Sequence, residues 1–267
     1  MKKRLVTAVD LANSKNMSTN RELYHFDDFT LEQYSILLDF AKEKFNFCDY
    51  SNCQEKDNFI IWRHDVDFSI HAALDLAKIE NEKGIISNYF ILLHSEFYNI
   101  FEKEIYEIIL NIAKLGHFIS LHFDSSFYKI ENILDLEQAL NFESSILEKL
   151  INTKVLSFSF HNPSVRDLTF EADNYAGLNN TYSSFFKKEV GYCSDSNGYW
   201  RFKRLKEYLI LPDMRNLQIL THPEWWRKEV MSPLEKVNFC IAGRANSNKK
   251  LYNQTLADNN RKIIDWK

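Results

Sequence analysis

The sequence predicts an α/β fold in which parallel strands alternate with helices. The first observation is the uninterrupted apolar run from Phe59 to Trp62, which is typical of a strand buried on both faces. The second is a helical pattern ending at Gly84, and the third is another apolar run from Ile85 to Leu93. A strand, a helix and a strand within about thirty residues indicate a right-handed crossover between parallel strands.

The rest of the chain repeats this unit. Further strands are predicted at 118–121, 155–160, 190–193 and 217–220, and helices at 31–45, 97–115, 133–150 and from 233 onward, with 205–211 forming a short helix or a strand. Thr30 and Ser69 are suited to cap the helices that follow them. Residues 1–27 are polar and aperiodic, so we expect an N-terminal arm beside a single domain formed by residues 28–267.

The composition excludes several classes of protein. The chain has 267 residues, of which 45% are hydrophobic, and a formal net charge of -4, so no basic face for nucleic acid is expected. Its four cysteines lack metal-binding spacing and predict free thiols in a reducing compartment: Cys48, Cys53, Cys193 and Cys240.

The sequence also bears on location and assembly. Basic residues near Met1 are followed by polar residues rather than by a long apolar segment, and no stretch approaches the roughly 20 apolar residues of a membrane span. We therefore expect a cytoplasmic protein without an integral membrane segment. The aromatic-rich surface helices would allow a homodimer.

Residues that bind metals or move protons stand at the ends of the predicted strands. They are Asp65 with Asp67, His94, His122 with Asp124, His161, Asp195 and His222. In a parallel barrel the carboxyl ends of the strands converge on one rim, so these residues would become neighbours. Asp65 and Asp67 are two residues apart and share a face in an extended chain.

Histidines and aspartates without paired cysteines suit a catalytic divalent ion, for which we expect zinc, with about three protein ligands. A carboxylate beside the ion would act as general base, and a histidine on the opposite wall would protonate the leaving amine. A single histidine is more often structural, and His71 and His117 are interpreted in that way. For the charged residues Arg63 to Asp67, the competing interpretation is a solvated strand end in which Arg63 forms a salt bridge.

Four segments resemble, in order, the motifs of the polysaccharide deacetylase superfamily. They are Arg63–Asp67, Gly116–His122, Ser194–Trp200 and Leu220–His222. The match is most similar to the branch found among surface-polysaccharide biosynthesis proteins. The resemblance implies a distorted seven-stranded (β/α) barrel and the metal-dependent removal of an N- or O-acetyl group from a sugar.

The resemblance also implies roles for individual residues. Asp65 would be the general base and His222 the general acid, with Asp195 supporting the catalytic set. Asp67 and His122 would be metal ligands. Where the typical deacetylase has a second histidine, four residues after the first, this chain has Ser126.

The third ligand is therefore open between His161 and Asp124. We favour His161, because an imidazole is the expected donor, although it would also suit contact with substrate. Arg63 would either orient Asp65 or hold an anionic sugar. Asn162 and Trp200 are also predicted to bind the substrate, with ordinary packing as the alternative for Trp200, because aromatic residues are plentiful in this chain.

The predicted function is thus a deacetylase acting on an acetylated sugar or glycan precursor in surface-polysaccharide biosynthesis. Ser126 favours an alternative, a catalytically inactive carbohydrate-binding protein with the same fold. A third hypothesis, hydrolysis of a phosphoester, is kept open by Arg63.

Overall fold

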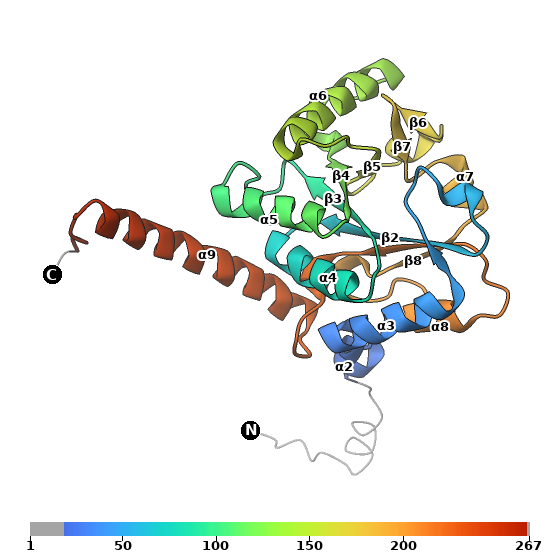
Figure 1. Cartoon of the computed structure of the whole chain (residues 1–267), viewed down its shortest axis with the longest axis horizontal. Helices are drawn as coiled ribbons and strands as arrows, with labels where there is room; N and C mark the ends of the chain where they lie inside the picture. Colours follow the sequence, from blue (N-terminus) through green and yellow to red (C-terminus); the bar gives the residue numbers. More distant parts are fainter. Residues whose placement is uncertain (1–18, 266–267) are drawn as a thin grey trace, which may run out of the picture.

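A computed structural model describes residues 19–265 and shows a curled, mostly parallel sheet flanked by helices (Figure 1). Residues 1–18 of the predicted arm lie outside the described residues. The remainder of that arm is not aperiodic, because Thr19 caps a short helix, α2 (Asn20–Leu23), and a 3-10 helix follows at Phe26–Phe29. Phe26 and Phe29 are buried, which ties this segment to the core.

The sheet provides the frame of the molecule. Its strands are β1 (Asn46–Phe47), β2 (Phe59–Val66), β3 (Asn88–Leu92), β4 (Phe118–Phe123), β5 (Ser157–Phe160), β6 (Asn174–Tyr175), β7 (Leu178–Asn180), β8 (Gly191–Ser194) and β9 (Leu217–Thr221). Across the described residues the strand order is β6-β7-β5-β4-β3-β2-β9-β8, with β1 paired to β2. Only the β6–β7 pair is antiparallel.

The predicted parallel α/β fold is confirmed. The seven strands from β7 to β8 are parallel neighbours, as the seven-stranded prediction requires, whereas the positions of β1, β6 and β7 were not predicted. Within residues 19–265 no pairing joins the two ends of the sheet. The strands therefore form an open half-barrel rather than a closed one.

Seven α-helices follow α2 in the described part of the chain, and α7 among them was not predicted. They are α3 (Leu31–Lys44), α4 (Ile70–Glu82), α5 (Lys103–Lys114), α6 (Ile133–Ile151), α7 (Ser184–Lys188), α8 (Leu205–Ile210) and α9 (Pro233–Asp258). Thr30 and Ser69 accept hydrogen bonds from backbone N–H groups at the starts of α3 and α4. Helix α5 starts later than predicted, because residues 97–102 form a loop in which the Tyr98 hydroxyl bonds the backbone of Val66 and Leu92.

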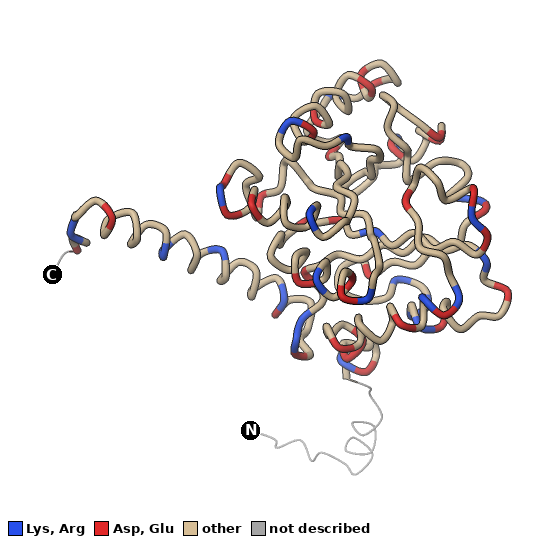
Figure 2. Tube along the Cα trace, viewed as in Figure 1, with Lys and Arg blue, Asp and Glu red and all other residues tan. Residues whose placement is uncertain are grey.

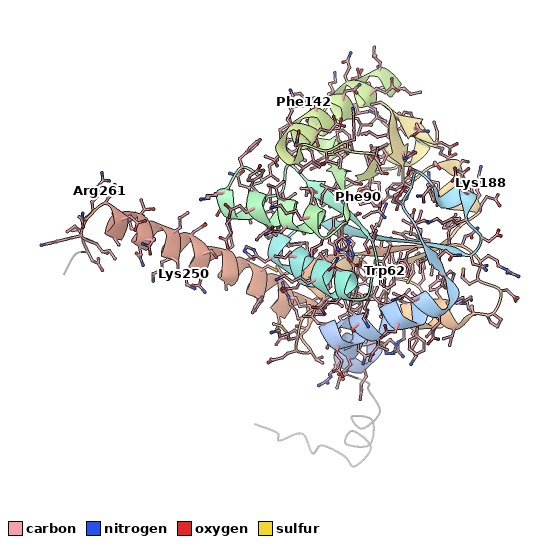
Figure 3. The ribbon with its side chains drawn as sticks, viewed as in Figure 1. Trp62, Phe90, Phe142, Lys188, Lys250 and Arg261 are labelled. Carbon is pink, nitrogen blue, oxygen red and sulfur yellow. The ribbon has the colours of Figure 1, made fainter. Side chains whose placement is uncertain are left out.

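Large apolar side chains fill the interior on both faces of the sheet. Trp62 on β2 and Phe90 on β3 are fully buried and lie well inside the fold (Figure 3). Cys48, Cys53 and Cys193 are buried, and all four cysteines are free thiols, as predicted.

Helix α9 leaves this body and extends away from it, carrying Lys250 along its length (Figures 1 and 3). Positive and negative residues are interspersed along the chain, as Figure 2 shows. Among the described helices, none combines the length and the apolar character that a membrane span requires.

Candidate active site

The strand ends converge as predicted. Strand β2 continues through Val66, so its pleat directs Arg63 and Asp65 to one face and His64 to the other. Asp67 follows β2, and His122 lies within β4. The cavity above these strand ends has a volume of about 1060 Å³, and its lining includes Asp65, Asp67, His122, His161 and His222.

Three of these side chains form a compact donor cluster. Asp67 Oδ1 lies 3.2 Å from His122 Nε2 and 3.4 Å from His161 Nδ1. The two imidazole nitrogens are 3.1 Å apart. Burial opposes the charge on Asp67, but the adjacent imidazoles of His122 and His161 lower the pKa of this carboxyl group. The geometry thus brings the favoured third donor, His161, beside the two predicted ligands.

Asp124 occupies a different position. Its Oδ1 accepts hydrogen bonds from the backbone N–H of Ser126 at 2.9 Å and from the Ser126 hydroxyl at 2.6 Å. The residue that replaces the usual histidine therefore binds Asp124 locally. The donor cluster among the described residues contains His161 and not Asp124.

The Nε2 atom of His161, on the side of the ring away from Asp67, contacts Asn162, which was predicted to bind substrate. Asn162 Nδ2 lies 2.8 Å from His161 Nε2, and Asn162 adopts a left-handed backbone conformation with a φ of 44°. A side-chain amide offers an oxygen or an NH₂ group, so either tautomer of His161 finds a partner there. Asn162 lines the cavity, and contact with substrate stays a prediction.

Asp65 is held from two sides. Arg63 Nη2 lies 3.4 Å from Asp65 Oδ2, and Ser159 Oγ lies 3.3 Å from Asp65 Oδ1. The Arg63 guanidinium also faces the rings of Phe90 and Tyr182. Burial alone would lower the pKa of Arg63, but the Asp65 carboxylate raises it well above its ordinary value, so the guanidinium is charged.

This environment bears on the predicted role of Arg63. Its side chain is 0% exposed and lies behind Asp65 instead of at the cavity surface. Of the two roles expected for Arg63, the structure therefore favours the contact with Asp65, and the expected contact with substrate is corrected. The strand pleat explains the difference, because residue 63 lies deeper in the sheet than residue 65 on the same face.

His222 and Asp195 form a second unit at the cavity. Asp195 Oδ1 lies 2.7 Å from His222 Nδ1, and both Asp195 oxygens accept the His222 backbone N–H. The Trp226 indole donates to Asp195 Oδ2 at 3.0 Å. Burial disfavours the imidazolium, but the Asp195 carboxylate outweighs it and raises the pKa of His222 to about 10. His222 Nε2 faces the donor cluster, 3.9 Å from Asp67 Oδ2.

The predicted contact between Trp200 and a sugar ring is corrected by the structure. Trp200 is 8% exposed and packs in the core, with its ring 4.9 Å from that of Phe29. Its indole N–H donates to Asp28. Asn197 and Gly198 adopt left-handed conformations that turn the chain before Trp200, which directs its side chain away from the cavity. Trp225, in contrast, lines the cavity.

The other histidines lie outside the donor cluster. His94 lines the cavity, where its Nε2 is 2.9 Å from Glu143 Oε1 and its ring stacks on Phe127. His117 is buried at the opposite end of β4, 2.9 Å from the Ala77 carbonyl, as its structural interpretation predicts. His71 is largely exposed and pairs with Glu104.

Sequence reasoning missed several residues of the site. Ser159 contacts both Asp65 and His122, while Tyr182 and Tyr192 line the cavity. The alternation Ser157-Phe158-Ser159-Phe160-His161 was a usable signal, because it places Ser159 on the face of β5 that leads to His161. Tyr182 lies in a turn after β7, where no comparable pattern precedes it, and Tyr192 lies within the predicted strand β8.

Comparisons with known proteins give matches among solved structures alone. No family model matches the chain, and no curated protein matches it. The matching solved structures include a family 4 acetyl xylan esterase from Clostridium thermocellum in complex with a cobalt ion. It is 13% identical, with a TM-score of 0.42, and the match covers 71% of this chain and 84% of that one.

Two further structures are of related kinds. A family 4 carbohydrate esterase from Bacillus anthracis is 14% identical, with a TM-score of 0.41 and coverage of 79% of this chain and 86% of that one. A Streptococcus pyogenes deacetylase in complex with acetate is 12% identical, with a TM-score of 0.38 and coverage of 89% and 93%. These three structures are of two esterases and a deacetylase.

Proposed function

We propose that the protein is a metal-dependent deacetylase that hydrolyses an N- or O-acetyl group on a sugar or glycan precursor. The observation that carries this proposal is the placement of Asp67, His122 and His161 within 4.8 Å of one another, with Asp65 and His222 beside them in one cavity. A cavity of about 1060 Å³ has room for a substituted sugar.

The donor cluster fits a divalent cation. Asp67 Oδ1 is buried and has no hydrogen-bond partner in the described part of the chain, and two imidazole nitrogens face it. Two imidazoles with one carboxylate are a ligand set that zinc uses in catalytic sites, so we propose zinc. When bound, the ion would polarise the acetyl carbonyl and favour ionisation of water.

Two side chains of the protein, Asp65 and His222, would accept and donate the protons. Asp65 would accept a proton from the attacking water as the new carbon–oxygen bond forms, and Arg63 would hold its carboxylate in place. His222 would donate a proton to the leaving nitrogen or oxygen as the scissile bond breaks, while Asp195 holds its imidazole in place. The products would be acetate and a free amine or hydroxyl group.

A direct test measures acetate release from acetylated amino-sugar nucleotides by the zinc- or cobalt-loaded protein. We expect Asp65→Asn and His222→Ala each to lower kcat/KM by at least about a hundredfold, the usual scale of acid–base catalysis. His71→Gln is the matched control, because His71 is exposed and pairs with the surface residue Glu104. Activity unchanged in both site variants would refute the assigned roles.

Two alternatives predict different results. An inactive carbohydrate-binding protein, which Ser126 favours, would hold no metal after purification without chelators and would take none up. A phosphoester hydrolase would release phosphate from sugar phosphates while leaving acetyl groups intact.

A role in surface-polysaccharide biosynthesis, a cytoplasmic location and a homodimeric state remain predictions from the sequence. Fractionation of cells and the solution mass of the purified protein would test the last two.

A further inference from the structure

Ser159 lies between two parts of the candidate site. It is 0% exposed, and its hydroxyl oxygen is 2.7 Å from His122 Nδ1 and 3.3 Å from Asp65 Oδ1. Ser159 and His122 are register partners in the parallel pair β4–β5, so their side chains point to the same face. Asp65 comes from β2, and the curl of the sheet brings it within reach.

The chemistry of the three groups fixes the direction of each hydrogen bond. A carboxylate only accepts, and Asp65 is paired with Arg63, so Ser159 donates its single proton to Asp65 Oδ1. The Ser159 oxygen then accepts from His122, which must carry its proton on Nδ1. The lone pair of His122 is consequently on Nε2, the nitrogen that faces Asp67 and His161.

We propose that Ser159 is a positioning residue that sets the tautomer of His122 for metal binding and couples this ligand to the base Asp65. The proposal rests on the proposed function and extends it to a residue outside the ligand and acid–base sets. A partner on the outer nitrogen of a metal-bound imidazole orients the ring and makes it a better ligand. Because the same hydroxyl donates to Asp65, the metal ligand and the base share one hydrogen-bonded chain.

The first experiment reads the tautomer directly in the full-length, metal-free protein. Nitrogen-15 NMR of the histidine side chains, assigned with a His122→Gln variant, is expected to show the His122 proton on Nδ1. In Ser159→Ala we expect this signal to be lost or moved to Nε2. A His122 proton on Nε2 in the unmodified protein would overturn the proposal.

The second experiment measures zinc affinity by competition with a chromophoric chelator. We expect Ser159→Ala to weaken zinc binding by about 10- to 100-fold, the usual effect of removing such a partner. Ser157→Ala is the matched control, because Ser157 is a buried serine of the same strand whose register partner is Asn179 of β7. We expect its zinc affinity to stay within about threefold, and circular dichroism would verify that both variants are folded.

The two experiments separate the two proposals. Equal zinc affinity in the folded Ser159→Ala variant and the unmodified protein would refute the role of Ser159 and leave the proposed function standing. A protein that takes up no zinc would refute the proposed function, whereas the His122 tautomer would still decide the role of Ser159.

Discussion

Lys236 offers the sharpest test of the energetics of this fold. It lies in the first turn of α9, is 0% exposed, and its Nζ has no hydrogen-bond partner among the described residues. The ammonium group faces the ring of Phe29 at 4.9 Å. Burial lowers the pKa of Lys236 to about 8 from an ordinary 10.5, so the folded protein carries this charge at a cost.

The magnitude follows from the two pKa values. A gap from about 8 to 10.5 corresponds to about 3 kcal/mol, at about 1.4 kcal/mol per pH unit. Lys236→Met keeps an unbranched, helix-favouring side chain and removes the charge. Loss of the contact with Phe29 offsets up to about 1 kcal/mol. We therefore expect the variant to be more stable than the unmodified protein by about 2 kcal/mol at pH 7.

The pH dependence has a definite sign. Below pH 8 Lys236 is protonated in both the folded and the unfolded chain, and the folded state bears the full free-energy cost of the buried charge. Between pH 8 and 10.5 only the unfolded chain binds it, so the stability of the unmodified protein rises with pH and the advantage of Lys236→Met shrinks. Urea unfolding followed by circular dichroism at pH 7, 9 and 10.5 would measure this.

Lys249→Met is the matched control, since Lys249 is exposed on the same helix. We expect its free energy of unfolding to change by less than about 0.5 kcal/mol. A Lys236→Met variant that is less stable than the unmodified protein at pH 7, or whose advantage is the same at pH 10.5, would refute the reasoning.

Two further predictions concern buried polar groups. Glu80 is fully buried and binds His64 at 2.7 Å and the hydroxyls of Tyr34 and Tyr89, so we expect Glu80→Gln to lower the free energy of unfolding by about 3 kcal/mol or more in urea. Burial would raise the pKa of Glu80, but His64 lowers it below its ordinary value. Its stabilisation is therefore present at neutral pH and lost on acidification, and the variant should lose less stability between pH 7 and 4. Trp226→Phe removes the indole donor to Asp195, so we expect a lower kcat/KM for acetate release and a loss of about 2 kcal/mol in thermal unfolding; full activity would argue against a role of this bond in holding Asp195.

The positions of six strands along the chain and the convergence of their ends could be predicted, because both depend on local patterns. Apolar runs predicted the strands, and the spacing of Asp65 and Asp67 placed both carboxyl groups on one face. The position of His161 after β5 was likewise sufficient to bring it to the rim.

Features that depend on distant partners could not be predicted. Strand β2 runs on through His64 because that imidazole finds Glu80 and Thr221, which are remote in sequence. The direction of Trp200 is set by left-handed residues in the turn before it.

The N-terminal part of the described chain is joined to the segment that follows β9. The backbone N–H of Leu31 donates to the Arg227 carbonyl at 2.8 Å, and the Arg227 N–H donates to the Phe29 carbonyl at 3.2 Å. Trp226 packs on Phe29 and Tyr34. During synthesis on the ribosome, about two hundred residues must therefore emerge before the first helices can dock, and contacts of such high sequence separation form slowly. The packing of Trp226 and Arg227 against the N-terminal segment, which lies next to His222 in the chain, is consequently among the last parts of the nascent protein to assemble.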